Sequence, residues 1–228
     1  MRHQTRRPMG PGRWRRAWRN ALRRAIRGDA GAAPPDPDDD VLHLVADGAL
    51  SCALTQLMRR HGTAVYRYCR EALHDATLAD DVHQQVFIEA FRDLGGFARR
   101  STLRVWLFAI ARHRVLDAAK KRRRRRDSGD ELEAAEPVDP QPLPGERLDD
   151  ERLRRALIAT MGELDERLRT ALLLRYQQGF TFEDIAEVCR EKSGTIRARI
   201  VRALPMVRAR IEARLRAPAP TDTQDRAA

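Results

Sequence analysis

Apolar residues in the last third of the chain recur at helical spacing in two stretches that a tight turn separates. Gly179 ends the preceding helix, and Thr181 can cap the next one with Asp184 as a capping-box-like partner. After the turn, Ser193 can cap a second helix. Its apolar positions share one face: Ile196, Ile200, Leu204, Val207 and Ile211. The pattern predicts a helix-turn-helix, a motif that places its second helix in the major groove of DNA.

The middle of the chain shows the same periodicity. Apolar positions between Leu50 and Tyr68 indicate a helix or a helix pair that is broken near His61 and Gly62. Residues 82–94 predict an amphipathic helix that stops at a Gly-Gly pair. Residues 102–123 predict a third long helix, which ends in a run of lysine and arginine. Further apolar positions in residues 153–175 predict two more helices before the helix-turn-helix.

These elements predict an all-α protein of two small helical domains, the second of which contains the helix-turn-helix. A flexible acidic linker is expected to join them, because the segment between them is rich in Pro, Asp and Glu. The expected boundaries are 1–40 for a basic, disordered extension with a Pro/Asp linker, 41–126 for the first domain, 127–149 for the acidic linker, 150–216 for the second domain and 217–228 for a disordered tail.

The net charge of +11 suggests a polyanionic partner. The first 28 residues hold ten arginines and no acidic residue, and Trp14, Trp18, Leu22 and Ile26 repeat there every four positions. This segment is either a basic amphipathic helix that contacts membrane or nucleic acid, or a disordered basic tail, or the result of a start codon assigned too far upstream.

Other chemistry receives little support from the sequence. Cys52, Cys69 and Cys189 lie in apolar helical contexts and are expected to be buried thiols in a reducing cytoplasm. The six histidines lack metal-ligand spacing and no Gly-rich phosphate loop is present, so we expect no metal, no cofactor and no enzyme. The longest apolar run, residues 105–111, is too short to span a membrane, and no secretory signal is expected.

Three segments resemble bacterial sigma factors. Residues 80–91 (DDVHQQVFIEAF) are similar to the region-2 helix, and residues 97–114 (FARRSTLRVWLFAIARHR) resemble the segment that melts and reads the −10 promoter element. Residues 163–202 resemble region 4, which reads the −35 element. The match covers roughly residues 50–126 and 150–215. With only a short linker between the two regions, the layout resembles the extracytoplasmic-function (group IV) subfamily.

The resemblance implies three functional surfaces. The residues that would dock on core RNA polymerase are Asp80, Asp81, Gln84, Gln85 and Glu89. The residues for the −10 region are Arg99, Arg100, Ser101, Thr102, Arg104, Arg112, His113, Lys120, Lys121 and Arg122, with a loop that could hold an extruded base. The residues for the −35 region are Ser193, Thr195, Arg197, Ala198, Arg199 and Arg202.

The sequence departs from the family pattern at three places. His113 stands where the family often carries Asn, and Arg190-Glu191 replaces the usual Gly and apolar residue of the turn. Pro205 falls inside the last apolar stripe, where it is expected to kink or interrupt the helix.

The partners implied are core RNA polymerase, promoter DNA and an anti-sigma factor. Two other hypotheses stay open: a helix-turn-helix regulator that binds DNA alone, and a binder of nucleic acid driven only by its arginines. The regulator would need neither the helix of residues 80–91 nor the basic helix that follows it.

Overall fold

A computed structural model describes residues 38–128 and 148–216 of the chain, and within these ranges every regular element is helical. In chain order these are α2 (Asp39–Ala46), α3 (Leu50–Leu73), α4 (Ala76–Leu94), α5 (Leu103–Asp127), α6 (Leu148–Gly162), α7 (Glu166–Leu172), the π-helical turn η1 (Leu173–Gln177), α8 (Phe182–Cys189) and α9 (Ser193–Arg216). The expectation of an all-α fold is confirmed. The basic extension, most of the acidic linker and the C-terminal tail lie outside the described residues.

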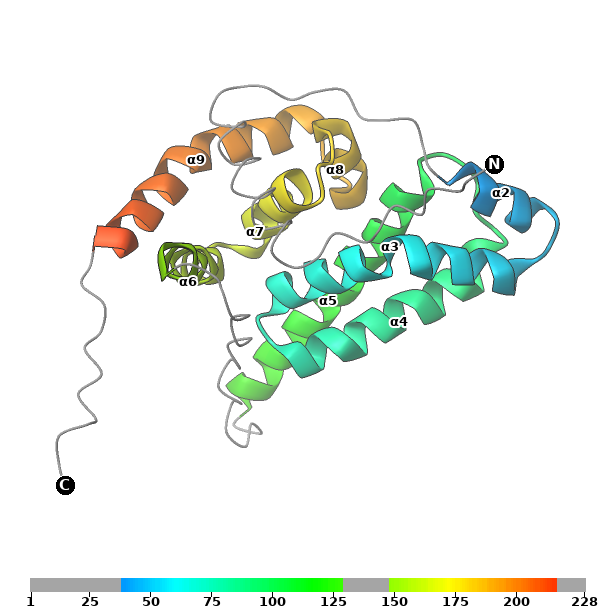
Figure 1. The fold of residues 1–228 in the computed structure, drawn as a ribbon, viewed down its shortest axis with the longest axis horizontal. Coiled ribbons are helices and arrows are strands. Elements are labelled where there is room, and N and C mark those ends of the chain that lie inside the picture. The colour runs from blue at the N-terminus through cyan, green and yellow to red at the C-terminus, as the bar shows by residue number, and fades with distance from the viewer. Residues whose placement is uncertain (1–37, 129–147, 217–228) are drawn as a thin grey trace.

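The first group of helices, α2 to α5, consists of three long helices that pack on one another, α3, α4 and α5, and of the short helix α2, which packs against α3 (Figure 1). The side chain of Asp75 caps α4 by accepting a hydrogen bond from the backbone N–H of Leu78 at 2.9 Å. From there Val82, Val86 and Ala90 place one buried side chain per turn toward the core. The helix ends at Leu94, immediately before Gly95, as the sequence predicts.

Helix α3 continues through His61 and Gly62, so the predicted break there is wrong. Gly62 is buried, and its carbonyl accepts a hydrogen bond from His83 Nε2 of α4 at 3.1 Å. A glycine inside a helix costs about 1 kcal/mol relative to alanine. Burial of the apolar face of α3 against α4 and α5 outweighs that cost.

Three acidic residues that the sequence assigned to the linker belong to the folded part. Asp38 is fully buried and accepts hydrogen bonds from His61 Nε2 at 2.9 Å and from Arg60 Nη1 at 2.8 Å. Arg60 also forms two parallel bonds with Asp40, each at 2.8 Å. Burial alone would raise the pKa of Asp38, but the bonds from His61 and Arg60 outweigh it and hold the pKa below its usual range. These bonds fix α2 against α3.

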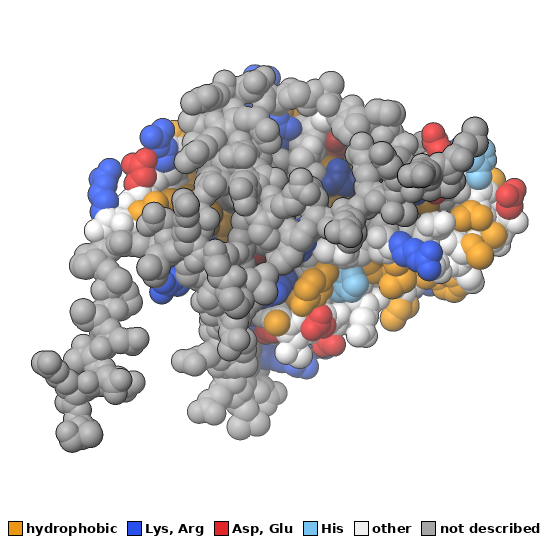
Figure 2. Space-filling model, viewed as in Figure 1, with side chains coloured by type: hydrophobic (Ala, Val, Ile, Leu, Met, Phe, Trp, Pro, Cys, Tyr) orange, Lys and Arg blue, Asp and Glu red, His pale blue; other side chains and the backbone are white. Residues whose placement is uncertain are grey.

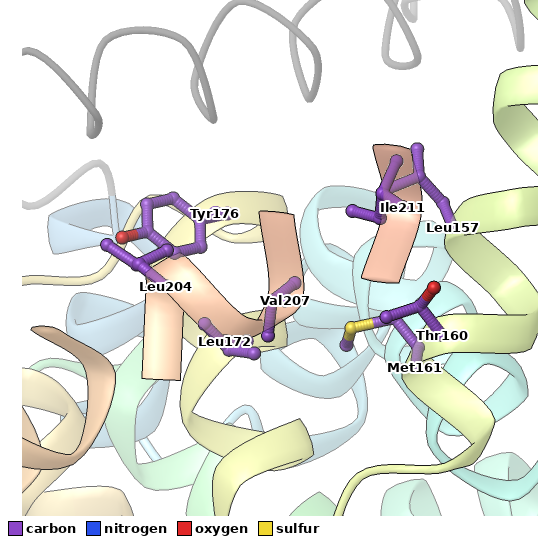
Figure 3. A pocket seen from close by; sticks show the side chains of 8 residues that line it. All are labelled: Leu157, Thr160, Met161, Leu172, Tyr176, Leu204, Val207 and Ile211. Atoms are coloured by element: carbon purple, nitrogen blue, oxygen red, sulfur yellow. The ribbon is translucent and has the colours of Figure 1, made fainter. Parts of the chain in front are cut away.

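The second group, α6 to α9, is built around apolar side chains that converge from α6, α7, η1 and α9 (Figure 3). The space left among them is about 10 Å³, at most enough for one water molecule, so this pocket is core and not a ligand site. Helix α9 runs through Pro205 without interruption, although the missing N–H leaves the carbonyl of Val201 without its usual helical donor. Pro205 is exposed, so water can reach that carbonyl.

The two groups pack directly against each other. The rings of Phe108 and Phe180 meet edge to face with centroids 5.1 Å apart, and Tyr68 also meets Phe108 edge to face, with centroids 5.7 Å apart. The guanidinium of Arg169 donates to the carbonyl of Ala72 on α3 at 3.1 Å. It also donates to two carbonyls at the end of α6 and to the carbonyl of Leu164 just after it. The sequence predicts two tethered domains but gives no sign of this contact between them.

Two of the three cysteines are buried, whereas the sequence predicts that all three are. Cys69 and Cys189 are buried, and burial raises the pKa of Cys69 to about 12. Cys52 is exposed on α3, so the prediction of three buried thiols is wrong for this residue.

Candidate nucleic-acid interface

The outer face of α4 carries the predicted polymerase-docking residues. Asp80, Asp81, Gln84 and Gln85 are all exposed, because they lie opposite the buried stripe of this helix. Glu89 differs from them, since its carboxylate accepts a hydrogen bond from Arg114 of α5 and its side chain is only 17% exposed. The exposed members of the predicted docking set therefore all lie in the first half of α4.

Two apolar residues on the same face were missed from the sequence. Ile88 is 69% exposed and Phe91 is 43% exposed, although both are large hydrophobic side chains. At 100° per residue, Ile88 lies between Asp81 and Gln84 around the helix. The signal was present, because neither residue fits the buried periodicity of α4. Figure 2 shows hydrophobic side chains gathered on the part of the molecule that α3 and α4 form.

The loop between α4 and α5 is shaped by its own predicted site residues. Thr102 caps α5, its hydroxyl accepting the backbone N–H of Val105 at 3.1 Å. Arg99 has a left-handed backbone with φ of 52° and donates to the carbonyl of Leu42 at 3.3 Å. Phe97 packs against Trp106 with ring centroids 5.3 Å apart. Arg100 is exposed and Ser101 half-buried at the tip, where a base could approach.

The basic residues of α5 divide into an exposed set and a set that the chain itself uses. His113, Lys120 and Lys121 are exposed. Arg122 donates to the carbonyl of Leu73 at 3.1 Å, at the C-terminus of α3. That bond gives Arg122 a structural task in addition to any contact with DNA.

Arg104 and Arg112 face the helix-turn-helix. Arg104 Nη2 donates to the carbonyl of Gln178 at 2.5 Å, and its guanidinium lies 4.4 Å from the ring centroid of Phe180. Burial lowers the pKa of Arg104. The Nε of Arg112 is buried, and its guanidinium lies beside Cys189 at the end of α8. In this arrangement α8 and the turn before it cover two residues that the sequence assigned to DNA.

The helix-turn-helix forms as predicted. Thr181 and Asp184 make a complete capping box at the start of α8, with bonds of 3.1 and 2.9 Å. Arg190 takes the left-handed conformation at the turn with φ of 54°, where glycine is more usual. The carboxylate of Glu191 accepts two hydrogen bonds from Arg199, at 3.1 and 2.5 Å. Hydrogen bonding from Arg199 lowers the pKa of Glu191. The two departures from the family turn thus produce a turn held by an ion pair.

The predicted −35 residues lie on α9 in two groups. Ser193, the predicted cap, is the first residue of α9, so the helix begins one residue earlier than predicted. Thr195, Arg199 and Arg202 line a shallow depression on one side of the helix. Arg197 is exposed on the other side, 5.9 Å from the ring centroid of Phe182. Ala198 lies half-buried between the two groups.

Comparison with known proteins connects these features. A family model for sigma-70 region 2 matches residues 57–125, and one for sigma-70 region 4 matches residues 154–204. The RNA polymerase sigma-H factor of Pseudomonas aeruginosa is 35% identical over 138 residues, which cover 58% of this chain and 72% of that protein. The ECF RNA polymerase sigma-E factor of Haemophilus influenzae is 34% identical, over 58% of this chain and 74% of that protein. The chain belongs to the ECF family of RNA polymerase sigma factors.

Solved structures agree with this family. The sigma factor RpoE in complex with the anti-sigma factor NepR from Bartonella quintana is 26% identical with a TM-score of 0.57, over 71% of this chain and 95% of that one. CnrH in complex with the cytosolic domain of CnrY is 26% identical with a TM-score of 0.53, over 75% and 95%. As a sigma factor, the chain is a subunit for transcription initiation and not an enzyme.

Neither a candidate membrane span nor a candidate metal cluster lies within the described residues of this sigma factor. None of its described helices is long and apolar enough to cross a membrane. Residues 38–128 and 148–216 also contain no group of three or more His, Cys, Asp or Glu side chains placed to hold a metal ion.

Proposed function

We propose that this sigma factor binds core RNA polymerase and directs initiation by recognising the −10 and −35 promoter elements and helping to melt the −10 region. One observation carries the proposal: the outer face of α4, the loop before α5 and the helix-turn-helix occur in one chain, and each presents exposed side chains suited to its role. A regulator that acts alone would need only the helix-turn-helix.

The polymerase would dock on the outer face of α4. Asp80 and Asp81 supply charge, and Gln84 and Gln85 supply hydrogen-bonding groups. Ile88 and Phe91 add apolar area in the middle of this surface, which is the composition of a protein interface with an apolar centre and a polar rim. Glu89 contributes less, since Arg114 already neutralises it.

The −10 element would be read at the loop before α5. Melting costs a few kcal/mol of lost base stacking, which capture of an extruded base can offset. Arg100 and Ser101 lie at the loop tip to hold such a base, while Arg99 and Thr102 maintain the shape of the loop. His113, Lys120 and Lys121 would follow the phosphates along α5.

Arg104 and Arg112 can take part only in a more open conformation. Both lie against η1, α8 or the segment between them. We therefore infer that the two helical groups separate when promoter DNA occupies α5.

The −35 element would be read by α9. Arg197 lies near the N-terminus of this helix and can reach the base edge of guanine, whereas Ser193, Thr195 and Arg202 suit the phosphate backbone. Arg199 would act mainly by holding the turn through Glu191.

An anti-sigma factor is the third proposed partner. Both solved relatives are complexes with a partner, an anti-sigma factor in one and the cytosolic domain of CnrY in the other. For this chain, a partner that stabilises the packing of α8 on α5 would keep Arg104 and Arg112 away from DNA.

Reconstitution tests the proposal. The purified full chain is mixed with core polymerase, the complex is isolated by size exclusion, and transcription is measured from a library of genomic promoter fragments. We expect a stable complex and initiation at a defined set of start sites. Sequence-specific DNA binding without polymerase association would favour a regulator that acts alone. Binding that ignores sequence and collapses with salt would favour the arginine-driven binder.

A further inference from the structure

The outward face of α9 carries one large apolar side chain at a place where a DNA-reading helix would be expected to be polar. Val201 is 55% exposed, although valine is among the poorer helix formers. The buried side of the same helix is complete without it, since Ile196, Ile200 and Ala203 fill the contact with α8 and its neighbours. Nothing in the described core requires an apolar residue at position 201.

Gly194 and Val201 stack on the same outward face. Seven residues correspond to about 700°, or roughly 20° from two full turns, so these two positions lie nearly in line along the helix. Arg197 and Ala198 lie between them, which completes the i, i+3, i+4, i+7 spacing by which a homeodomain helix reads the major groove.

The space around this face points to close approach by a partner. A Cβ atom added to Gly194 would meet nothing within 4 Å, so the fold itself would accept a larger residue there. Glycine is a poorer helix former than alanine, by up to about 1 kcal/mol in a helix interior, and Gly194 is the second residue of α9. A small residue at position 194 is explained if a second molecule lies against this part of α9.

The flanks of the face identify the chemistry of that molecule. Exposed Arg197 lies on one side of Val201, and exposed Thr195 and Arg202 lie on the other. Val201 between Arg197 and Arg202 complements a partner surface that is anionic at its edges and has an apolar group between them. In the DNA major groove the phosphates are the edges, and the only apolar group on the base edges is the C5 methyl of thymine.

We propose that Val201 is a specificity-determining residue that packs against the C5 methyl of a thymine in the −35 element. This inference rests on the proposed −35 role of α9 and adds an apolar contact to the arginine contacts already assigned. Ala198, which is half-buried beside it, would allow the base edge to approach the helix closely.

The experiment uses the full chain bound to core polymerase and two DNA libraries with a randomised −35 window. The libraries differ only in carrying thymidine or deoxyuridine in that window, so the second lacks the C5 methyl. We expect wild type to prefer thymine over uracil by about 3- to 5-fold at one position, the value for roughly one buried methyl group. Val201→Ala should lose most of this difference. The control is Met206→Ala, which removes another exposed apolar side chain of α9.

The outcomes separate the inference from the proposed function. Equal enrichment of thymine and uracil by wild type, or an unchanged preference in Val201→Ala, would overturn the role of Val201 while leaving −35 recognition intact. Loss of polymerase binding by Val201→Ala would also overturn it and make this face a protein contact. No enrichment of any base by wild type would refute −35 recognition itself, and the inference with it.

Discussion

Replacing Arg104 with alanine should loosen the packing between the two helical groups. The side chain contributes a charged hydrogen bond to the carbonyl of Gln178 at 2.5 Å and a guanidinium 4.4 Å from the ring centroid of Phe180. Such a hydrogen bond contributes about 1.5–3 kcal/mol and a desolvated cation–π contact about 2 kcal/mol. Because opening rehydrates both Arg104 and Gln178, we expect a net loss of about 2 kcal/mol, a shift of roughly 30-fold toward open forms.

Energy transfer between two dyes measures this change in the full chain. Cys52 is exposed and accepts one dye, and Ala213→Cys on α9 provides an exposed site for the other. Cys69 and Cys189 are buried with raised pKa values, so their thiols react slowly. Arg104→Ala should lower the transfer efficiency, whereas Lys120→Ala, which removes an exposed cation from the same helix, should not. If Arg104→Ala keeps the efficiency of wild type, the contact does not hold the two groups together.

Three further predictions concern single surfaces. The double variant Asp80→Arg/Asp81→Arg should abolish co-purification with core polymerase without altering the circular dichroism spectrum. The control Asp47→Arg, at another exposed site, should keep co-purification. Retained polymerase binding by the double variant would refute docking on α4. Arg197→Ala should weaken DNA binding by about 1–3 kcal/mol and relax base preference at one or two −35 positions. Arg202→Ala should weaken binding to all −35 sequences alike and reduce the slope of log affinity against log salt concentration by about one. Equal weakening of every −35 variant by Arg197→Ala would contradict base reading. Asp38→Asn should lower the urea midpoint of unfolding at pH 6. The difference in midpoint between wild type and variant should shrink below pH 3.8, because the pKa of Asp38 is depressed in the folded state and the stability that this gives is lost as the pH falls through that folded-state pKa. A gap of equal size at pH 6 and pH 3 would argue against this ion pair.

Much of the candidate site could be predicted from the sequence because it depends on local rules. The capping box of Thr181 and Asp184 involves neighbours three residues apart, and the exposed face of α4 follows from helical periodicity. The assignment of Arg104 and Arg112 to DNA followed the same local reasoning. It could not include the contact with Phe180 and Cys189, which lie more than 70 residues further along the chain.

The net charge also shows how little the sequence alone says about long-range contacts. Ten of the 44 basic residues and none of the 33 acidic ones lie in the first 28 residues, so the rest of the chain is nearly neutral. The net charge of +11 therefore says little about α5 or α9. Affinity of these helices for DNA depends instead on which arginines are exposed and which, like Arg199, are already paired with a carboxylate.

The sequence by itself determined the all-α class, the order of the helices from α4 onward, the helix-turn-helix and the family, because periodicity, capping and motif spacing are properties of near neighbours. It did not predict the short helix α2. The tertiary structure decided the continuity of α3 through Gly62, the burial of Asp38 and the contact between the two groups. Each of these depends on packing or on ion pairs between residues far apart in the chain. Such energies exceed the local cost of a glycine or a buried carboxylate, but they exist only once the distant partner is in place.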